Sequence, residues 1–182
     1  RVQKHLNPRG LAALGALALG ACSGPAPGPM PQAQIVQAAL ATGPALEADL
    51  RLVFSPTMLE ALDRGIPLTL SMELRADTRG ATRLVERQQL ELRYLPLAQQ
   101  YQWLESASGA RRTFPRRTQL LAALDHVRLA LPASWGTITA GTPLALSLTL
   151  DRSALPGPLR LPSLLARDWR LPEARHAWPH AG

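Results

Sequence analysis

The stretch Leu144-Ala145-Leu146-Ser147-Leu148-Thr149-Leu150 decides the fold class, because leucines alternate along it with small or polar side chains without a break. Alternation with a period of two is typical of a β-strand that buries one face and exposes the other. A strand with one solvated face belongs to an antiparallel sheet, since parallel sheets are covered on both faces. This stretch therefore predicts an antiparallel sheet with one apolar side.

The same alternation recurs along most of the chain before this stretch. Several strands of this kind need a second layer over their apolar side, so we expect a mainly β fold, an antiparallel β-sandwich or a partly closed barrel. The predicted strands cover 46–54, 68–75, 90–94, 101–103, 127–131 and 144–150.

Two short stretches interrupt the alternation with helical spacing. Ser55 followed by Pro56 offers an N-cap and a proline in the first turn, which predicts a helix over 56–64. A second set of leucines at helical spacing follows Pro115 and predicts a helix over 116–124. Each helix is expected to cover an open end or edge of the sheet, which would also protect that edge from pairing with other chains.

The N-terminal segment has the three parts of an export signal: a basic start, an apolar stretch over 11–19, and small residues before Cys22. The apolar stretch is well short of the ~20 residues that span a bilayer as a helix, so no permanent transmembrane helix is expected here. Cys22 is the only cysteine, and it stands where a bacterial lipoprotein signal peptidase cleaves and lipid is attached. The alternative is an ordinary cleaved signal in which Cys22 is incidental.

Composition divides the chain further. Residues 23–34 contain four prolines and read as an extended spacer. A lipidated Cys22 would hold the protein at the bacterial cell envelope, facing the periplasm, on the inner or the outer membrane, and Ser23 after the cysteine favours the outer one. The predicted parts are a signal peptide over 1–21, a lipid-attachment cysteine with a Pro-rich linker over 22–44, a β-sandwich domain over 45–172 and a flexible tail over 173–182.

The positive charge has two origins. The whole chain has a formal charge of +7, but without residues 1–21 it has 17 arginines against 13 acidic residues and no lysine. One dense cluster lies beyond the leader and could meet anionic head groups or phosphates, or be a solvated loop and helix start. No aromatic stacking platform accompanies it, so nucleic acid is not an expected partner. The cluster consists of Arg111, Arg112, Arg116 and Arg117.

Sequence signatures of catalysis are missing. The chain has no Gly-x-Ser-x-Gly elbow and no Gly-rich phosphate loop. His176 and His180 have ligand-like spacing, but Pro179 between them argues against a helical pair, so neither a metal nor a cofactor is expected. A hydrolase acting on cell-wall or lipid material stays open as an alternative, and it would need the polar-face carboxylates to converge in one cleft. These carboxylates are Asp49, Glu73, Glu91 and Asp151.

Four stretches resemble one proteobacterial family, which is classified as a domain of unknown function, number four-three-nine-zero. They are ALDRGIPL over 61–68, LRYLPLAQQY over 92–101, LDRSALPGPLRL over 150–161 and DWRL over 168–171. The resemblance implies an exported protein without an assigned activity, often encoded near a membrane sensor kinase of the nitrogen-regulation type. No catalytic residues are established for the family, so the resemblance assigns none.

These stretches also have a physical interpretation. Tyr94 and Tyr101 flank a proline break, and a hairpin there would bring their rings together. Asp151, Arg152 and Arg160 flank a Pro-Gly turn, where they could form an ion-pair clasp or a binding rim.

Taken together, these features predict a lipid-anchored, non-enzymatic binding module. Its partners would be the membrane, through lipid on Cys22, and an envelope protein. The alternatives are a periplasmic accessory to a membrane sensor kinase and the hydrolase described above.

Overall fold

The computed structural model describes residues 28–41, 43–77 and 83–181; the expected signal peptide and Cys22 lie outside these ranges. Nine strands, three short α-helices and three 3-10 turns occur in the described part. In chain order they are β1 (Gln32–Ala41), β2 (Ala45–Val53), α1 (Pro56–Asp63), β3 (Leu68–Asp77), β4 (Arg83–Leu95), β5 (Gln100–Glu105), β6 (Arg111–Phe114), α2 (Arg117–Leu124), β7 (His126–Ala130), η1 (Ala133–Thr137), β8 (Pro143–Leu150), η2 (Arg152–Ala154), α3 (Gly157–Leu165), η3 (Arg167–Trp169) and β9 (Ala174–Pro179).

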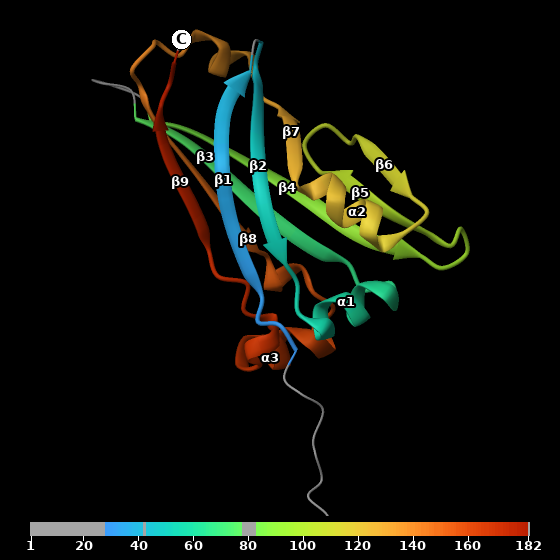
Figure 1. The fold of residues 1–182 in the computed structure, drawn as a ribbon. Coiled ribbons are helices and arrows are strands. Elements are labelled where there is room, and N and C mark those ends of the chain that lie inside the picture. Colours follow the sequence, from blue (N-terminus) through green and yellow to red (C-terminus); the bar gives the residue numbers. More distant parts are fainter. Residues whose placement is uncertain (1–27, 42, 78–82, 182) are drawn as a thin grey trace, which may run out of the picture.

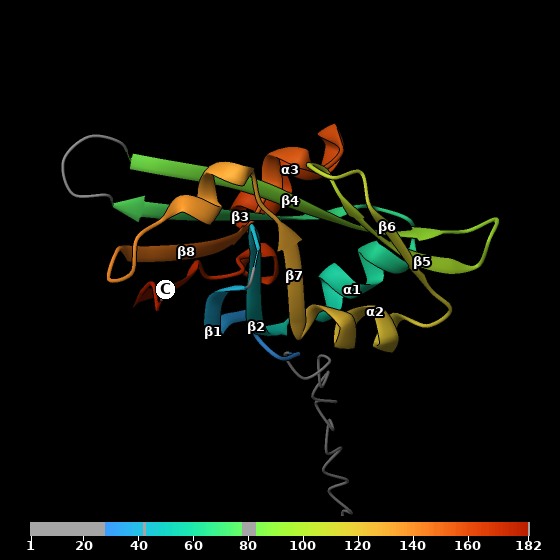
Figure 2. The same cartoon turned by 90° about the horizontal axis from the view of Figure 1, so that it is seen from above.

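The strands form two separate antiparallel sheets, as the alternation predicts. One has three strands in the order β1-β2-β7, and the other has six in the order β6-β5-β4-β3-β8-β9. The small sheet lies across the large one, and its strands cross those of the large sheet obliquely (Figures 1 and 2). The sandwich is therefore confirmed, and the sheets do not close into a barrel.

The core lies between the two sheets. On β3 every second side chain, from Leu68 to Ala76, is buried, and β8 buries its leucines in the same way. Gln88 is a buried polar side chain on the inner face of β4: its amide donates to the Ala130 carbonyl at the end of β7 over 3.2 Å. This hydrogen bond joins the sheets and satisfies a buried polar group, which would otherwise destabilise the fold.

The two predicted helices are confirmed, and they complete the second layer. Ser55 caps α1, accepting a hydrogen bond from the Met58 amide over 3.1 Å. The small sheet is too narrow to cover the large one, and α1 packs against β4 while α2 contacts β5, β6, β2 and β7. Both helices thus cover the part of the large sheet that the small sheet leaves open (Figure 1).

The expected boundaries of the domain were wrong at both ends. The linker over 22–44 contains β1, and the tail over 173–182 contains β9, which pairs with β8. A bulge between Ile35 and Gln37 shifts the register of β1 and breaks the period-two pattern that would have revealed it. On β9 the inward positions hold Ala174, His176 and Trp178, so no aliphatic alternation marks the strand.

Two further elements differ from expectation. The sequence predicts a turn around Gly157, but this stretch begins α3. The proline at the second position of α3 is compatible with the first turn of a helix. The first half of the arginine cluster, expected in a loop, forms the edge strand β6.

Candidate functional site

An open basin lies where the end of α1, the β4–β5 turn and the start of α2 meet. Its volume is about 570 Å³. These elements lie side by side on one flank of the domain in both views (Figures 1 and 2). The basin is lined by Asp63, Tyr94, Gln99, Tyr101, Pro115, Arg116, Arg117 and Thr118.

One carboxylate organises this basin. The phenol of Tyr101 donates to Asp63 Oδ1 over 2.7 Å, and the guanidinium of Arg117 pairs with Asp63 Oδ2. Tyr94 is the register partner of Tyr101 across the β4–β5 hairpin, and their ring centroids lie 4.8 Å apart. The expected meeting of the two tyrosine rings is thus observed, at the edge of the core.

The network fixes the protonation of Tyr101. Burial raises the pKa of its phenol to about 12, and the hydrogen bond to Asp63 and the negative charge of that carboxylate act in the same direction. The phenol therefore stays protonated, as a hydrogen-bond donor, over the whole physiological range.

Arg116 is the uncommitted cation of the basin. Its side chain is exposed and has no hydrogen-bond or ion-pair partner among the described residues. It occupies the N-cap position of α2 and gives no side-chain oxygen to the first amide groups of that helix. The first turn of a helix carries partial positive charge, so Arg116 and the start of α2 together favour an anionic group.

Tertiary structure divides the arginine cluster of the sequence. Arg112 lies on the inner face of β6, with its guanidinium carbon 5.1 Å from the ring centroid of Trp103 and 5.6 Å from that of Phe114. Arg111 lies on the opposite face, because successive strand residues point to opposite sides. Only Arg116 and Arg117 reach the basin, so the four arginines are not one patch.

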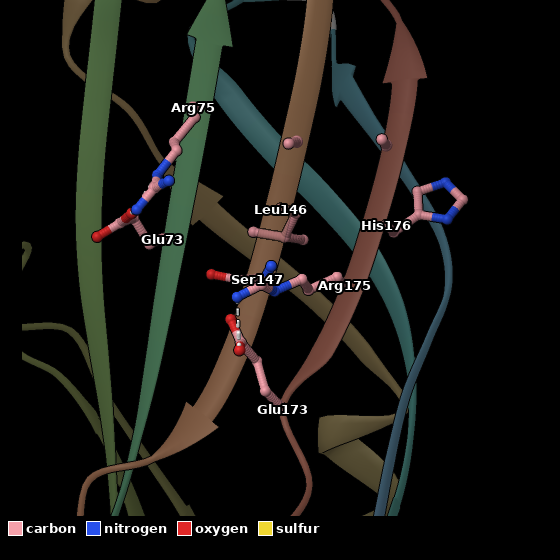
Figure 3. A pocket seen from close by; sticks show the side chains of 9 residues that line it. Glu73, Arg75, Leu146, Ser147, Glu173, Arg175 and His176 are labelled. Carbon is pink, nitrogen blue, oxygen red and sulfur yellow. Dashed lines mark hydrogen bonds and ion pairs between the residues drawn. The ribbon is translucent and has the colours of Figure 1, made fainter.

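A second depression of about 290 Å³ crosses the outer face of the large sheet (Figure 3). Short side chains on β8 and β9, namely Ala145, Ser147 and Ala177, leave it hollow. The charges beside it are mutually paired: Glu73 binds Arg75 and Arg87, and Arg175 binds Glu173 over 2.8 Å. Hydrogen bonding to Arg87 in particular lowers the pKa of Glu73. The depression therefore offers less unmatched charge to a ligand than the basin does.

Three of the four stretches that carry the family resemblance meet around α1, and the remaining one, over 150–161, covers η2 and the start of α3. The first supplies Asp63 and the second supplies both tyrosines of the basin. At the other end of α1, Ser55 donates to the Asp168 carbonyl over 2.6 Å and Thr57 to its carboxylate over 3.0 Å.

The sequence model of one family, described as a domain of unknown function (DUF4390), matches residues 32–179. The chain belongs to the DUF4390 family. The match begins at the start of β1 and ends with β9, so it follows the observed domain and not the boundaries expected from composition. No curated protein and no solved structure matches the chain.

The carboxylates considered for a hydrolase do not converge in this DUF4390 domain. Asp49 pairs with His126 on the small sheet, at 2.6 Å, whereas Glu73 and Glu91 bond to arginines on the large sheet. Asp151 accepts from the Ser153 amide over 2.9 Å and caps η2. Within the described residues no group of three or more His, Cys, Asp and Glu side chains could hold a metal ion. His176 lies in β9 with its ring stacked on Trp178 at 5.5 Å.

The predicted clasp of Asp151, Arg152 and Arg160 is not formed. Arg152 donates to the Ser163 carbonyl over 3.3 Å and Arg160 to the Leu155 carbonyl over 2.7 Å. Both arginines thus fasten α3 to the segment before it. None of the helices in the described ranges is long and apolar enough to cross a bilayer.

Asp63 is the basin residue that sequence reasoning missed. Its two partners lie 38 and 54 residues away, and no local pattern indicates them. Gln99 was missed as well; it lines the basin from the β4–β5 turn with φ at +50°, in the left-handed region.

Proposed function

We propose that the protein is a lipid-anchored module of the cell envelope that binds a protein partner through the basin, and that the partner presents an acidic segment there. The observation that carries this proposal is that the unpaired Arg116 lines the basin together with Tyr94 and with a carboxylate that is already matched by Arg117. An exposed arginine beside tyrosines is the composition of energetically important contacts in protein interfaces.

Charge explains the choice of an acidic segment. Asp63 would repel an anion, but the Arg117 guanidinium offsets its charge and the Tyr101 phenol occupies its other oxygen. Arg116 and the start of α2 then leave net positive character in the basin. A carboxylate of the partner would lie against Arg116, with apolar atoms of the segment on Tyr94.

The same geometry favours binding over catalysis. A nucleophile or general base must lose or accept a proton near neutral pH. With its pKa at about 12, Tyr101 stays protonated there, and both oxygens of Asp63 are already engaged. The groups in the basin are suited to hold a partner in place.

The anchor is the second part of the proposal and rests on Cys22 with its preceding small residues. Several acyl chains together give stable attachment to a bilayer, whereas a single chain gives marginal binding. Such a module would meet partners within the envelope and keep them near the membrane.

Partner capture from detergent-solubilised envelopes tests the basin. A photo-crosslinking residue at Thr118, which lines the basin, should capture a defined protein. Arg116→Glu should weaken that binding about 30-fold, the effect of losing a contact worth about 2 kcal/mol. Arg51→Glu is the matched control, because Arg51 is an exposed arginine on β2 outside the basin.

The proposal predicts that capture is lost with Arg116→Glu and kept with Arg51→Glu. Equal capture by both variants, or the absence of any specific product, would overturn the basin as a binding site. The anchor is tested separately: the N-terminal peptide of the mature protein should begin at Cys22 and carry the mass of attached acyl chains, and Cys22→Ser should abolish both the cleavage and the added mass. A mature N-terminal peptide without acyl chains would overturn lipid attachment.

A further inference from the structure

Helix α3 exposes three leucines on one side. The exposed fractions of Leu161, Leu164 and Leu165 are 73%, 48% and 81%. Positions i, i+3 and i+4 are neighbours on a helix surface, so these side chains form a continuous apolar face. Scattered exposed leucines are ordinary, but a grouped set marks a contact site. We refer to these three residues as the leucine face.

The leucine face lies at the end of the domain where the described chain begins. A Cβ on Gly28 would lie 2.5 Å from Pro56, so the residues before β1 pass against the start of α1. The same start of α1 is bound to Asp168 in η3, which packs against α3. In Figure 1 the beginning of β1 and α3 both lie at the lower end of the sandwich, and Figure 2 shows them on opposite sides of that end.

The segment that carries the leucine face is positively charged. From residue 151 to residue 170 the chain has four arginines and two aspartates. Both aspartates accept hydrogen bonds from neighbouring hydroxyl groups, Asp151 from Ser153 and Asp168 from Thr57. The arginines are Arg152, Arg160, Arg167 and Arg170.

We propose that the leucine face lies in the head-group region of the bilayer to which the protein is anchored. This inference rests on the proposed lipid attachment at Cys22. Only five residues separate Cys22 from Gly28, and the six steps from one to the other reach at most about 22 Å, since one residue spans no more than about 3.6 Å. The anchor therefore keeps this end of the domain within about 22 Å of the membrane surface.

The chemistry of α3 is compatible with the head-group region of a bilayer. A short helix with leucines on one side and arginines around them is suited to lie in the interface, with its apolar side toward the acyl chains. Arginine side chains can extend to anionic phosphates while their stems stay on the apolar surface. A protein partner would need neither the arginines nor this position beside the anchor.

The sole cysteine makes a direct test possible. With lipid on Cys22, Leu165→Cys introduces the only free thiol of the chain, which can carry an environment-sensitive dye. The lipidated full chain is reconstituted in vesicles of phosphatidylethanolamine and phosphatidylglycerol. Leu97→Cys is the matched control, because Leu97 is a fully exposed leucine in the β4–β5 turn, away from α3 (Figure 2).

The dye at position 165 should show blue-shifted emission that quencher-bearing lipids suppress, and the dye at position 97 should behave as in water. Arg167→Glu together with Arg170→Glu, both exposed positions, should reduce the shift at position 165. If the chain carries lipid and floats with the vesicles but both dyes report water, the lipid contact is overturned and the anchor stands. If the measured mass of the N-terminal peptide shows no lipid on Cys22, both the lipid contact of α3 and the anchor are overturned. Immersion of the dye at position 97 instead would show that another face meets the bilayer.

Discussion

The phenol of Tyr101 on β5 donates a hydrogen bond to the carboxylate of Asp63, the last residue of α1, over 2.7 Å. The second oxygen of that carboxylate binds Arg117 in the first turn of α2. A single side chain thus holds a strand and two helices that are far apart in sequence. Since these elements also form the basin, the stability of this corner and the proposed binding depend on the same residue.

Replacing Asp63 should loosen this corner. Asp63→Ala leaves the Tyr101 phenol and the Arg117 guanidinium without their partner, and we expect the free energy of unfolding to fall by about 1–2 kcal/mol. Glu60→Ala is the control on the same helix, because Glu60 forms an exposed pair with Arg64 at 2.6 Å. Such exposed pairs contribute no more than about 1 kcal/mol, and often nothing measurable. Urea denaturation of both variants measures the difference, and equal losses would contradict the role of Asp63.

Alkaline pH should destabilise the protein through Tyr101. Its pKa is about 12 in the fold against the ordinary value of 10.0, so the unfolded chain loses this proton first. The stabilising effect is therefore complete below pH 10 and is lost as the pH rises toward about 12. In Tyr101→Phe this part of the slope of stability against pH should disappear. Absorbance titration of the phenols checks that the group with the raised pKa is Tyr101. If Tyr101→Phe loses stability at high pH as the unchanged protein does, another group is responsible for that loss.

Acid should weaken the outer face of the large sheet through Glu73. Hydrogen bonding to Arg87, followed by that to Arg75, keeps the pKa of this carboxyl below its ordinary 4.5. The unfolded chain then takes up the proton first as the pH falls, so stability is present above about pH 4.5 and is lost below it. Glu73→Gln and Arg87→Gln should each flatten this slope. The effect of Arg87→Gln should be the smaller one, because Arg75 still binds the carboxylate, and the double variant should match Glu73→Gln, through which Arg87 acts; a further loss in the double variant would refute the pairing.

Arg112 should protect Trp103. The indole is buried, its Nε1 has no hydrogen-bond partner in the described part of the chain, and the guanidinium of Arg112 lies 5.1 Å from its ring centroid. We expect Arg112→Ala to cost up to about 1 kcal/mol of unfolding free energy, the upper end of the range for an exposed cation–π contact. The substitution should also increase the quenching of tryptophan fluorescence by iodide. Arg111→Ala, on the opposite face of β6, should change neither quantity by a comparable amount.

Local pattern and long-range pairing explain which parts of the fold were predictable. The strands over 46–54, 68–75 and 144–150 alternate strictly, so their inward faces follow from the order of residues alone. The bulge between Ile35 and Gln37 removes that regularity, and β1 becomes recognisable as a strand only through its pairing with β2.

The candidate site was predictable in part. The proline break between Tyr94 and Tyr101 indicates a hairpin, and a hairpin places the two rings together. The sequence indicates Arg116 and Arg117 as part of one arginine cluster. Their separation from the other two arginines is not predictable, because adjacency in sequence does not show which side of an edge strand each residue occupies. Asp63 carries no local signal, since its role comes from partners on β5 and α2.

The sequence by itself determined the class of fold, two of the helices, the N-cap of the first and the side of each regular strand that faces the core, because these depend on neighbours a few residues apart. Tertiary structure decided the order of the six strands, the division of the arginines and the meeting of Asp63, Tyr101 and Arg117. These features depend on strand register and on packing between distant segments. No local periodicity in the sequence indicates such contacts.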